Sequence, residues 1–351
     1  MSKFINAKYA GLEAYTPGEQ PKDMQYIKLN TNESPFPPSA GVLAAVAENA
    51  DKLNLYPDPD CAELKEELAK LYGVKKENIY VSNGSDDILN FFFLGFCDGG
   101  AVFPDITYGF YKVYAELYGI NYTKIPLCQD FNVNPADYMN VGKNVVLANP
   151  NAPTGLTLGL DKIEEILKSN KENMVLIDEA YVDFGGESCI PLAKKYNNLL
   201  VVGTFSKSRS LAGGRLGFAV ADKEIIADLE KIKYSTNPYS INRLTLVAGV
   251  AAVRDNGYYM DNCKLVMTAR EYTASELGKM GFSVLDSKAN FIFAESDRIG
   301  GKELYEKLKA KGILVRYFGS DRISNFVRIT IGTMEQMRAL VKAVDEILKG
   351  E

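Results

Sequence analysis

Histidine and tryptophan are both absent from this chain of 351 residues. Without histidine, the protein cannot use an imidazole base, a serine–histidine relay or a histidine-ligated zinc ion. Any proton transfer must therefore be carried out by another kind of side chain. A lysine amine is a natural candidate, because lysines serve as general bases in other proteins.

Cysteine is scarce as well, and its spacing fits neither a disulfide framework nor a metal site. The chain has five cysteines, an odd number, and no two of them form a Cys-x-x-Cys pair. We therefore expect reduced thiols that contribute to packing. The residues concerned are Cys61, Cys97, Cys128, Cys189 and Cys263.

Long apolar segments and an excess of positive charge are also missing. No stretch approaches the roughly 20 apolar residues that cross a bilayer, and the first residues lack the apolar core of a signal peptide. The net charge of −5 argues against general affinity for nucleic acid or anionic membranes. We expect a cytoplasmic protein whose anion sites are local pockets.

The first two thirds of the chain alternate short apolar runs with amphipathic segments. This alternation is typical of an α/β domain with a largely parallel sheet covered by helices on both faces. At 46% hydrophobic residues, the chain can bury a large core and is long enough for two domains. The expected strands are residues 78–82, 101–103, 121–125, 145–148, 175–177, 200–203 and 216–220.

After Arg215 the pattern changes to that of a smaller α+β domain. Helices are expected at residues 225–232, 243–253, 264–279, 302–310 and 334–348, and strands at 291–293, 313–316 and 326–329. The proline-rich start reads as an arm. We predict an arm at residues 1–34 that contributes to the small domain and the substrate site, a large domain at 35–245 and a small domain at 246–351.

A lysine in a loop rich in hydroxyl groups is the first candidate for chemistry. Thr204 and Ser206 precede Lys207, and Arg215 follows it eight residues later. A lysine amine can form a Schiff base with a carbonyl cofactor, while hydroxyls and an arginine can hold a phosphate on that cofactor. Pyridoxal 5'-phosphate fits this combination. In isolation, this motif would favour the interpretation of Lys207 as a surface lysine in a Ser/Gly loop, so the rest of the chain must decide.

Three further loops follow expected strands, where open α/β sheets usually place ligand groups. Residues 82–87 combine Gly84, Ser85 and Asp86 ahead of a helical run, which predicts either a phosphate site at a helix N-terminus or an ordinary N-cap. Asp178 and Tyr181 follow the strand at 175–177 and could meet a pyridine nitrogen and a phenolic oxygen, although a metal motif or a solvated turn is also open. Residues 149–155 contain asparagines whose side chains could point at a ring, although the segment could also be simply a rigid connection between elements.

Taken together, these motifs resemble the fold-type I pyridoxal-phosphate aminotransferases, and within them the histidinol-phosphate aminotransferase group. The resemblance covers essentially the whole chain. Each motif is modest, but their order and spacing are specific. Besides the loops above, the matching segments are YTPG (15–18), LNTNESP (29–35), YPDP (56–59) and VRITIG (327–332).

The resemblance implies roles for the residues around the cofactor. Lys207 would be the Schiff-base lysine, Asp178 the partner of the ring nitrogen and Tyr181 the partner of the ring O3' atom. Tyr108 would stack on the ring, although it could also be a core tyrosine beside Tyr111. The phosphate would be held by the backbone around Gly84, Ser85 and Asp86, with Thr204, Ser206 and Arg215.

Two further implications concern the dimer and one departure from the family pattern. Tyr56 matches a tyrosine that reaches the cofactor phosphate of the neighbouring subunit, so the resemblance implies a homodimer with shared active sites. The family's commoner form has an asparagine immediately before Pro-Thr-Gly, where this chain has Ala152. Asn151 or Asn149 would cover its contact with O3', or Tyr181 would hold O3' with less help.

The substrate site implied by the resemblance lies between the arm and the small domain. Arg328 matches an arginine that receives the substrate's carboxylate or phosphate, and Arg316, Tyr15 and Asn32 would join it. Two arginines and a tyrosine suit a dianion, because bidentate charge-assisted bonds add up. Arg316 could alternatively form a salt bridge at the rim.

The function implied is a ping-pong transamination through a Lys207 aldimine. Histidinol phosphate and 2-oxoglutarate would give imidazole-acetol phosphate and glutamate, in histidine biosynthesis. An aromatic amino acid aminotransferase is one alternative, and a threonine-phosphate decarboxylase is weakened because its His-Gly-Gly segment is impossible here. A ligand-sensing aminotransferase-like domain is the non-enzymatic alternative, although only a short arm precedes the domain where such regulators carry a helix-turn-helix.

Overall fold

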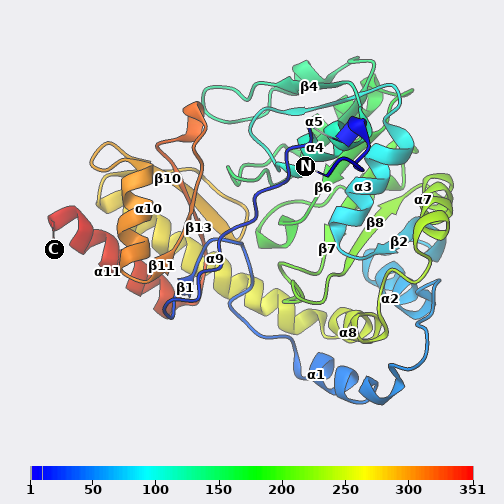
Figure 1. Cartoon of the computed structure of the whole chain (residues 1–351), viewed down its shortest axis with the longest axis horizontal. Helices are drawn as coiled ribbons and strands as arrows, with labels where there is room; N and C mark the ends of the chain where they lie inside the picture. Colours follow the sequence, from blue (N-terminus) through cyan, green and yellow to red (C-terminus); the bar gives the residue numbers. More distant parts are fainter. Residues whose placement is uncertain (1, 10, 351) are drawn as a thin grey trace.

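The computed structural model describes residues 2–9 and 11–350. Within this part of the chain, a seven-stranded sheet forms the centre of the larger half (Figure 1). All neighbouring strands run parallel except β8, which is antiparallel to both of its neighbours. The order across the sheet is β2 (Ile79–Ser82), β8 (Gly217–Ala221), β7 (Leu199–Thr204), β6 (Val175–Asp178), β5 (Asn144–Ala148), β3 (Ala101–Pro104) and β4 (Tyr122–Ile125).

Helices cover both faces of this sheet, which explains why its central strands are apolar at nearly every position. In β6, Val175 and Ile177 face one core while Leu176 faces the other. One face is covered by α3 (Ser85–Phe96), α4 (Phe110–Tyr118) and α7 (Lys223–Thr236). The other is covered by α1 (Ala40–Ala47), α2 (Ala62–Tyr72), α5 (Leu160–Ser169), α6 (Ile190–Ala193) and α8 (Arg243–Arg254).

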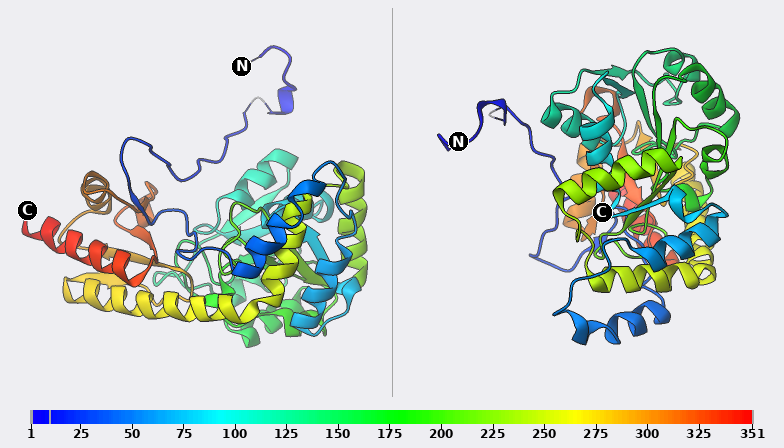
Figure 2. Two further views of the ribbon diagram at one scale, coloured as in Figure 1. Left: turned by 90° about the horizontal axis from the view of Figure 1, so that it is seen from below. Right: turned by 90° about the vertical axis from the view of Figure 1, so that its right-hand side faces the viewer.

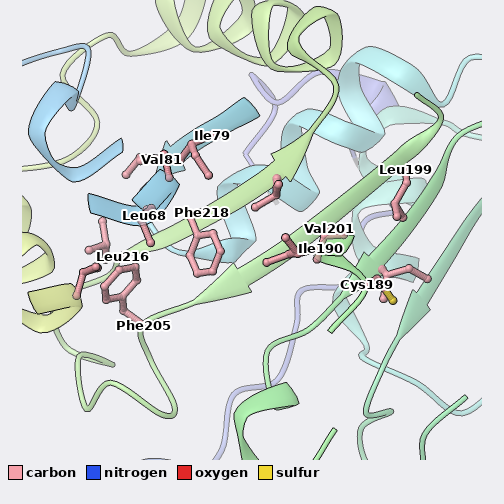
Figure 3. Close-up of a cluster of buried hydrophobic side chains, with 14 of the residues drawn as sticks. Leu68, Ile79, Val81, Cys189, Ile190, Leu199, Val201, Phe205, Leu216 and Phe218 are labelled. Carbon is pink, nitrogen blue, oxygen red and sulfur yellow. The ribbon is translucent and has the colours of Figure 1, made fainter. Parts of the chain in front are cut away.

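Figure 3 shows part of the second of these cores. Ile79 and Val81 from β2 lie near Phe218 from β8, and Val201 from β7 lies near Ile190 from α6. All five side chains are buried. Apolar contacts of this kind hold the strand ends in place, and the residues after those ends form the site.

The smaller half is built on a four-stranded antiparallel sheet with its own core. Its order is β12 (Arg316–Tyr317), β13 (Val327–Thr330), β10 (Phe291–Ser296) and β9 (Phe282–Val284). The helices around it are α9 (Asn256–Lys279), α10 (Gly301–Ala310) and α11 (Met334–Lys349). Short 3-10 helices occur at Ala7–Tyr9, Ala50–Lys52, Lys76–Asn78, Pro135–Tyr138, Val182–Phe184 and Asp321–Ile323.

The N-terminal arm joins the smaller half through one short strand. β1 (Ile27–Lys28) pairs in parallel with β11 (Ile313–Leu314). Figure 2 shows the stretch before β1 leading away from the body of the molecule. The predicted boundary after residue 245 falls inside α8, which packs on α1 and α2. The division into domains stays a prediction.

The seven strands predicted for the large sheet are all present, with ends that differ by one residue at most. In the smaller half, the single strand predicted at 313–316 is wrong, because Val315 separates β11 and β12, which lie in different sheets. β1 and β9 were not predicted, and α9 begins eight residues earlier than expected. None of the described helices is both long and apolar enough to span a membrane.

The cysteines are free thiols, and four of the five are buried. Cys128 is exposed, so the expected packing role is wrong for it. It follows β4 in the loop before residue 132, where its backbone N–H donates to Asn132 O.

Candidate active site

The carboxyl ends of the central strands meet along one edge of the large sheet. Ala148 at the end of β5 is in register with Asp178 at the end of β6, and Asp178 is in register with Val202 of β7. The loops that continue from these strands enclose a cavity of about 360 Å³. The predicted residues that line it are Ser85, Asp86, Tyr108, Asp178, Tyr181, Thr204, Ser206, Lys207 and Arg215.

Asp178 provides a buried carboxyl group in the cavity wall. Its Oδ2 accepts a hydrogen bond from the Tyr111 hydroxyl at 2.9 Å, and its Oδ1 accepts one from the Ala180 N–H at 3.1 Å. Burial raises the pKa of Asp178 to about 6, although both hydrogen bonds and the charge of Lys207 act in the opposite direction. A carboxylate with two fixed donors and one open side is suited to hold a protonated ring nitrogen.

Lys207 reaches into the same cavity from the loop after β7. Its Nζ donates to Thr31 O at 3.2 Å and lies 5.7 Å from the centre of the Tyr181 ring. Among the described residues Lys207 forms no ion pair at 4.0 Å or less. The alternative interpretation as a surface lysine is therefore wrong, since the side chain is part-buried beside two predicted site residues.

The N-terminus of α3 forms another part of the cavity wall. Its N-cap is Gly84, with a φ of 80°, and no side chain caps the helix. The alternative interpretation of an N-cap made by Ser85 or Asp86 is therefore wrong, and backbone N–H groups of the first turn are left for an anion. Gly217 allows this turn to approach β8, because a Cβ there would lie 2.4 Å from Ser85 N.

Two hydroxyl groups and a guanidinium complete this end of the cavity. Thr204 Oγ1 lies 3.0 Å from Ser206 Oγ and accepts the Ser206 N–H at 3.1 Å. Arg215 Nη2 donates to Asp86 Oδ2 at 3.0 Å, and a Cβ on Gly84 would come within 2.6 Å of that same nitrogen. Uncapped N–H groups, hydroxyls and an arginine are the donors that bind phosphate.

Tyr108 and Tyr181 border both this cavity and a second one beside it. The Tyr108 hydroxyl donates to Asp86 Oδ1 at 3.0 Å, and burial raises the pKa of Tyr108 well above its usual value. Tyr181 accepts a hydrogen bond from Asn32 Nδ2 at 3.0 Å. Asn32 itself is buried with a φ of 56°, and Thr330 Oγ1 both donates to its side chain and accepts its N–H.

The second cavity, of about 560 Å³, collects the predicted substrate residues. Arg328 of β13 lies between the rings of Phe291 and Phe318, at 5.4 and 5.6 Å from their centres. Its Nη2 donates to Asn30 O at 3.0 Å, but its Nε is buried without a hydrogen-bond partner. Burial lowers the pKa of Arg328, and among the described residues it has no carboxylate partner. A half-buried guanidinium without a carboxylate partner is suited to an anionic ligand.

Arg316 and Tyr15 border the same cavity near its opening. Arg316 donates to the backbone oxygens of Thr16 and Pro17, at 3.2 and 3.3 Å. A rim salt bridge, the alternative for Arg316, does not occur among the described residues. The Tyr15 ring stacks on Phe110 of α4 at 4.3 Å, so the arm contacts the large half at this cavity.

Asn151 is a correction, because the structure does not bring its amide to either cavity. Its Oδ1 accepts from Thr107, and its Nδ2 donates to Ile106 O and Thr154 Oγ1. The Asn149 amide likewise forms two hydrogen bonds with the backbone of Leu158, one through its nitrogen and one through its oxygen. Ala152 lines the cavity instead. Neither asparagine amide faces the cavity, whereas Tyr181 lines it, and its contact with O3' stays a prediction.

Tyr56 also lies away from the cavities of its own chain, as a role in a neighbouring subunit requires. Its side chain is 78% exposed and stacks on Tyr239 at 4.6 Å. Arg243 Nη2 donates to its backbone oxygen at 2.7 Å. Its role in a partner's site stays a prediction.

Three residues near the cofactor cavity were not singled out from the sequence. Thr31 and Glu33 line it and are joined by a hydrogen bond of 2.8 Å, while Lys28 pairs with Glu33 at 2.7 Å. The Tyr111 hydroxyl donates to Asp178 Oδ2. Thr31 and Glu33 lie in the matching segment LNTNESP, which was the signal available for them, whereas Tyr111 lies in the first turn of α4 and had no signal of its own.

The residues present fit pyridoxal 5'-phosphate. A primary amine lies in the cavity wall with a buried carboxyl group, while uncapped N–H groups and hydroxyls form a phosphate site. The donors therefore match a phosphate, an aldehyde and a ring nitrogen, which are the three polar groups that the cofactor presents to a protein.

Comparison with known proteins agrees with this architecture. Residues 24–344 match the family model described as aminotransferase class I and II. A histidinol-phosphate aminotransferase of Brachyspira hyodysenteriae is 54% identical over 353 residues, covering 99% of this chain and 100% of that protein. One of Clostridium acetobutylicum is 47% identical over 351 residues, with the same coverage.

A solved structure shows the same fold. The histidinol-phosphate aminotransferase of Sinorhizobium meliloti, in complex with pyridoxal-5'-phosphate, superposes with a TM-score of 0.85, covering 93% of this chain and 92% of that one at 22% identity. The chain belongs to the aminotransferase class I and II family, with the fold-type I architecture. Within this family it falls in the histidinol-phosphate aminotransferase group, as its full-length relatives show.

Proposed function

We propose that this protein is a pyridoxal-phosphate-dependent aminotransferase of histidine biosynthesis. It moves an amino group between histidinol phosphate and 2-oxoglutarate, giving imidazole-acetol phosphate and glutamate, in either direction. The relatives at 46 to 54% identity carry the name of this activity over the full chain. The observation that carries the proposal is the shared wall of the two cavities, in which Lys207 and Tyr181 border both the cofactor site and the arginine site.

The chain's own residues divide the work of the reaction. When bound, the cofactor supplies an electron sink for the negative charge that develops at the substrate carbon. Lys207 would hold the cofactor covalently and, as a free amine, would move the proton at the substrate Cα. Asp178 would hold the proton on the ring nitrogen, and Tyr181, which accepts a hydrogen bond from Asn32, would donate to O3'. The first turn of α3 would hold the phosphate together with Thr204, Ser206 and Arg215.

The substrate's own anion is assigned to the second cavity. Arg328 has a buried Nε without a partner, and Arg316 is bound only to backbone oxygens of the arm. Two guanidinium groups with Tyr15 match the two charges of a phosphate ester better than the single charge of a carboxylate. This is the structural basis for preferring histidinol phosphate over phenylalanine or tyrosine.

We also propose that the protein is a cytoplasmic homodimer with shared active sites and has no nucleic-acid or membrane partner. Leu53, Leu55 and Tyr56 expose large apolar surfaces in one short segment, at 59, 56 and 78%. Contiguous apolar surface of this kind is typical of an interface. A second subunit would cover the segment and receive Tyr56 near its cofactor phosphate.

The substrate assignment is tested by steady-state kinetics of Arg316→Ala on two kinds of amino donor. We expect kcat/KM for histidinol phosphate to fall by a factor equivalent to about 2–4 kcal/mol of lost transition-state stabilisation, because a charge pair with the phosphate is lost. The loss should arise mainly from a higher KM. Activity on phenylalanine, which presents one carboxylate to Arg328, should fall much less.

The matched control is Arg298→Ala, since Arg298 also donates to a backbone oxygen, that of Met280, but lies on the surface outside both cavities. Its kinetics should equal those of the wild type. Equal losses of Arg316→Ala on both donors would show a structural role for Arg316 and would favour an aromatic amino acid aminotransferase.

A further inference from the structure

Tyr111 donates a hydrogen bond to Asp178 but does not itself line the cofactor cavity. It lies in the first turn of α4, three residues after Tyr108, and its side chain is completely buried. Its ring packs edge-on against the rings of Tyr108 and Phe103, with centres 5.7 and 6.0 Å apart. The Tyr111 hydroxyl donates to Asp178 Oδ2 at 2.9 Å.

The hydrogen bond to Asp178 has a defined polarity. Burial and the neighbouring charge of Asp178 raise the pKa of Tyr111 well above its usual value, so the phenol stays protonated and donates. The Ala180 N–H donates to the other carboxyl oxygen. Each oxygen of a carboxylate can accept a second hydrogen bond, so both donors leave room for one from the cavity.

We propose that Tyr111 is a positioning residue, which fixes the orientation of Asp178 and favours its anionic form for the ring nitrogen of the cofactor. The inference rests on the proposed function, because it assigns Asp178 that partner. Tyr111 does not line the cavity and touches neither cofactor nor substrate. Its contribution acts entirely through the carboxyl group of Asp178.

The charges around Asp178 show why such support matters. Burial and the carboxylate of Asp86, from α3, raise the pKa of Asp178, while Lys207, from the loop after β7, lowers it. The phenols of Tyr108 and Tyr181 are the other titratable groups near this pair. The Tyr111 hydrogen bond opposes the burial and lowers the pKa of Asp178. In a chain without histidine, a phenol also has an advantage, since it does not titrate near neutral pH as an imidazole would.

The test is Tyr111→Phe, which keeps the ring and removes only the hydroxyl. In the apoprotein, the Asp178 carboxyl group, followed by carbon-13 NMR with Asp178→Asn for assignment, should titrate at a higher pH than in the wild type. In the loaded enzyme, kcat should fall roughly 10- to 100-fold, as for a lost hydrogen bond to a charged group, with KM for the amino donor unchanged. Tyr118→Phe is the matched control, because its hydroxyl donates to Asn90 on the same face of the sheet.

Two outcomes would overturn the inference while wild-type activity stands. One is an unchanged Asp178 titration in Tyr111→Phe. The other is additive losses in kcat when Tyr111→Phe and Asp178→Asn are combined, because a residue that acts through Asp178 should add nothing once that carboxylate is gone. Absence of transamination in the wild type would instead contradict the proposed function and leave the apoprotein titration as the test of the contact.

A second variant covers the case in which Tyr111→Phe does not fold. Incorporation of 3-fluorotyrosine at position 111 keeps the ring and the hydroxyl but makes the phenol a stronger acid and donor. The Asp178 carboxyl group should then titrate at a lower pH, the opposite direction to Tyr111→Phe. An unchanged or raised titration would overturn the inference.

Discussion

Individual ionisable side chains at the active site lie in surroundings where their charged forms are less stable than in water. Asp178 is a buried carboxyl group, and Arg328 is half-buried, with a buried Nε that has no hydrogen-bond partner among the described residues. Keeping the charged form of either group away from water costs free energy unless a group of opposite charge pairs with it. The bound cofactor and the substrate anion are the groups that would offset these costs, so ligand binding should stabilise the protein.

At this scale, the first prediction is that Lys207 carries the cofactor covalently. Lys207→Ala should abolish the cofactor's attachment after borohydride reduction, because no other lysine lines the cofactor cavity among the described residues. Peptide mass spectrometry of the reduced protein locates the modified residue. An adduct retained on another lysine would contradict the assignment.

A second prediction concerns the pH dependence contributed by Asp178. Its pKa is about 6 in the native protein and near 3.8 in an unfolded chain, so the native state binds more protons between these values. Stability from this group is therefore fully present below about pH 4 and is lost as the pH rises through about 6. Asp178→Asn should make the apoprotein more stable than the wild type at pH 8, by at most about 3 kcal/mol, and no more stable at pH 4.

Chemical unfolding of the apoprotein at pH 4, 6 and 8 measures this difference. Asp98→Asn serves as the control, because Asp98 is exposed, and it should show no pH-dependent gain in stability.

The same Asp178→Asn protein should still bind the cofactor but transaminate more slowly by orders of magnitude, since an amide cannot hold the ring proton in the transition state. A turnover close to that of the wild type would contradict the role given to Asp178.

At the scale of elements, the phosphate site depends on how closely α3 approaches β8. Gly84 begins the helix without a side-chain cap, and Gly217 lies against its first turn. This arrangement leaves backbone N–H groups free at a point where the positive end of the helix faces the cavity. The affinity for the cofactor phosphate therefore depends on backbone packing as well as on Arg215.

The third prediction follows from this contact. Gly217→Ala would place a Cβ 2.4 Å from Ser85 N, so the first turn of α3 must move, at a cost of about 1–3 kcal/mol. Cofactor affinity, measured by titrating the apoprotein, should fall. Gly278→Ala in α9 is the control, because no heavy atom lies within 4 Å of the added Cβ. Equal affinity in both variants would show that the helix position does not set phosphate binding.

At the scale of the whole molecule, the two halves and the arm converge on one site. The large half supplies Asp178 and Lys207, the small sheet supplies Arg316 and Arg328, and the arm supplies Tyr15. Because β1 pairs with β11, the arm is tied to the small half. Substrate binding therefore depends on the relative position of all three parts.

The fourth prediction concerns the proposed dimer. Leu55→Asp places a charge in the exposed apolar segment and should shift the protein toward monomers in sedimentation velocity, with loss of cofactor affinity. Tyr56→Phe should keep the dimer and lose only part of the cofactor affinity, since only a hydroxyl is removed. Leu265→Asp is the control, because Leu265 is equally exposed on α9. A monomeric wild type with full activity would contradict the shared site.

Much of the fold could be predicted from local sequence, because burial on both faces of a parallel sheet leaves continuous apolar runs. The same is true of Lys207, Asp178 and Tyr181, which follow strand ends whose meeting point is dictated by parallel topology. The structure brings these three residues to one cavity, whereas their roles toward the cofactor stay predictions implied by the family resemblance. Short strands such as β1 and β9 were not, since two or three residues carry no periodic signal.

What only the tertiary structure decided are contacts between distant parts of the chain. It directs the amide of Asn151 toward Ile106, Thr107 and Thr154 and leaves Ala152 at the cavity. It also divides the segment around Val315 between two sheets. It also joins Tyr111 to Asp178, which are 67 residues apart. Local pattern reports which side of an element is buried, whereas the partner found there depends on how the elements pack.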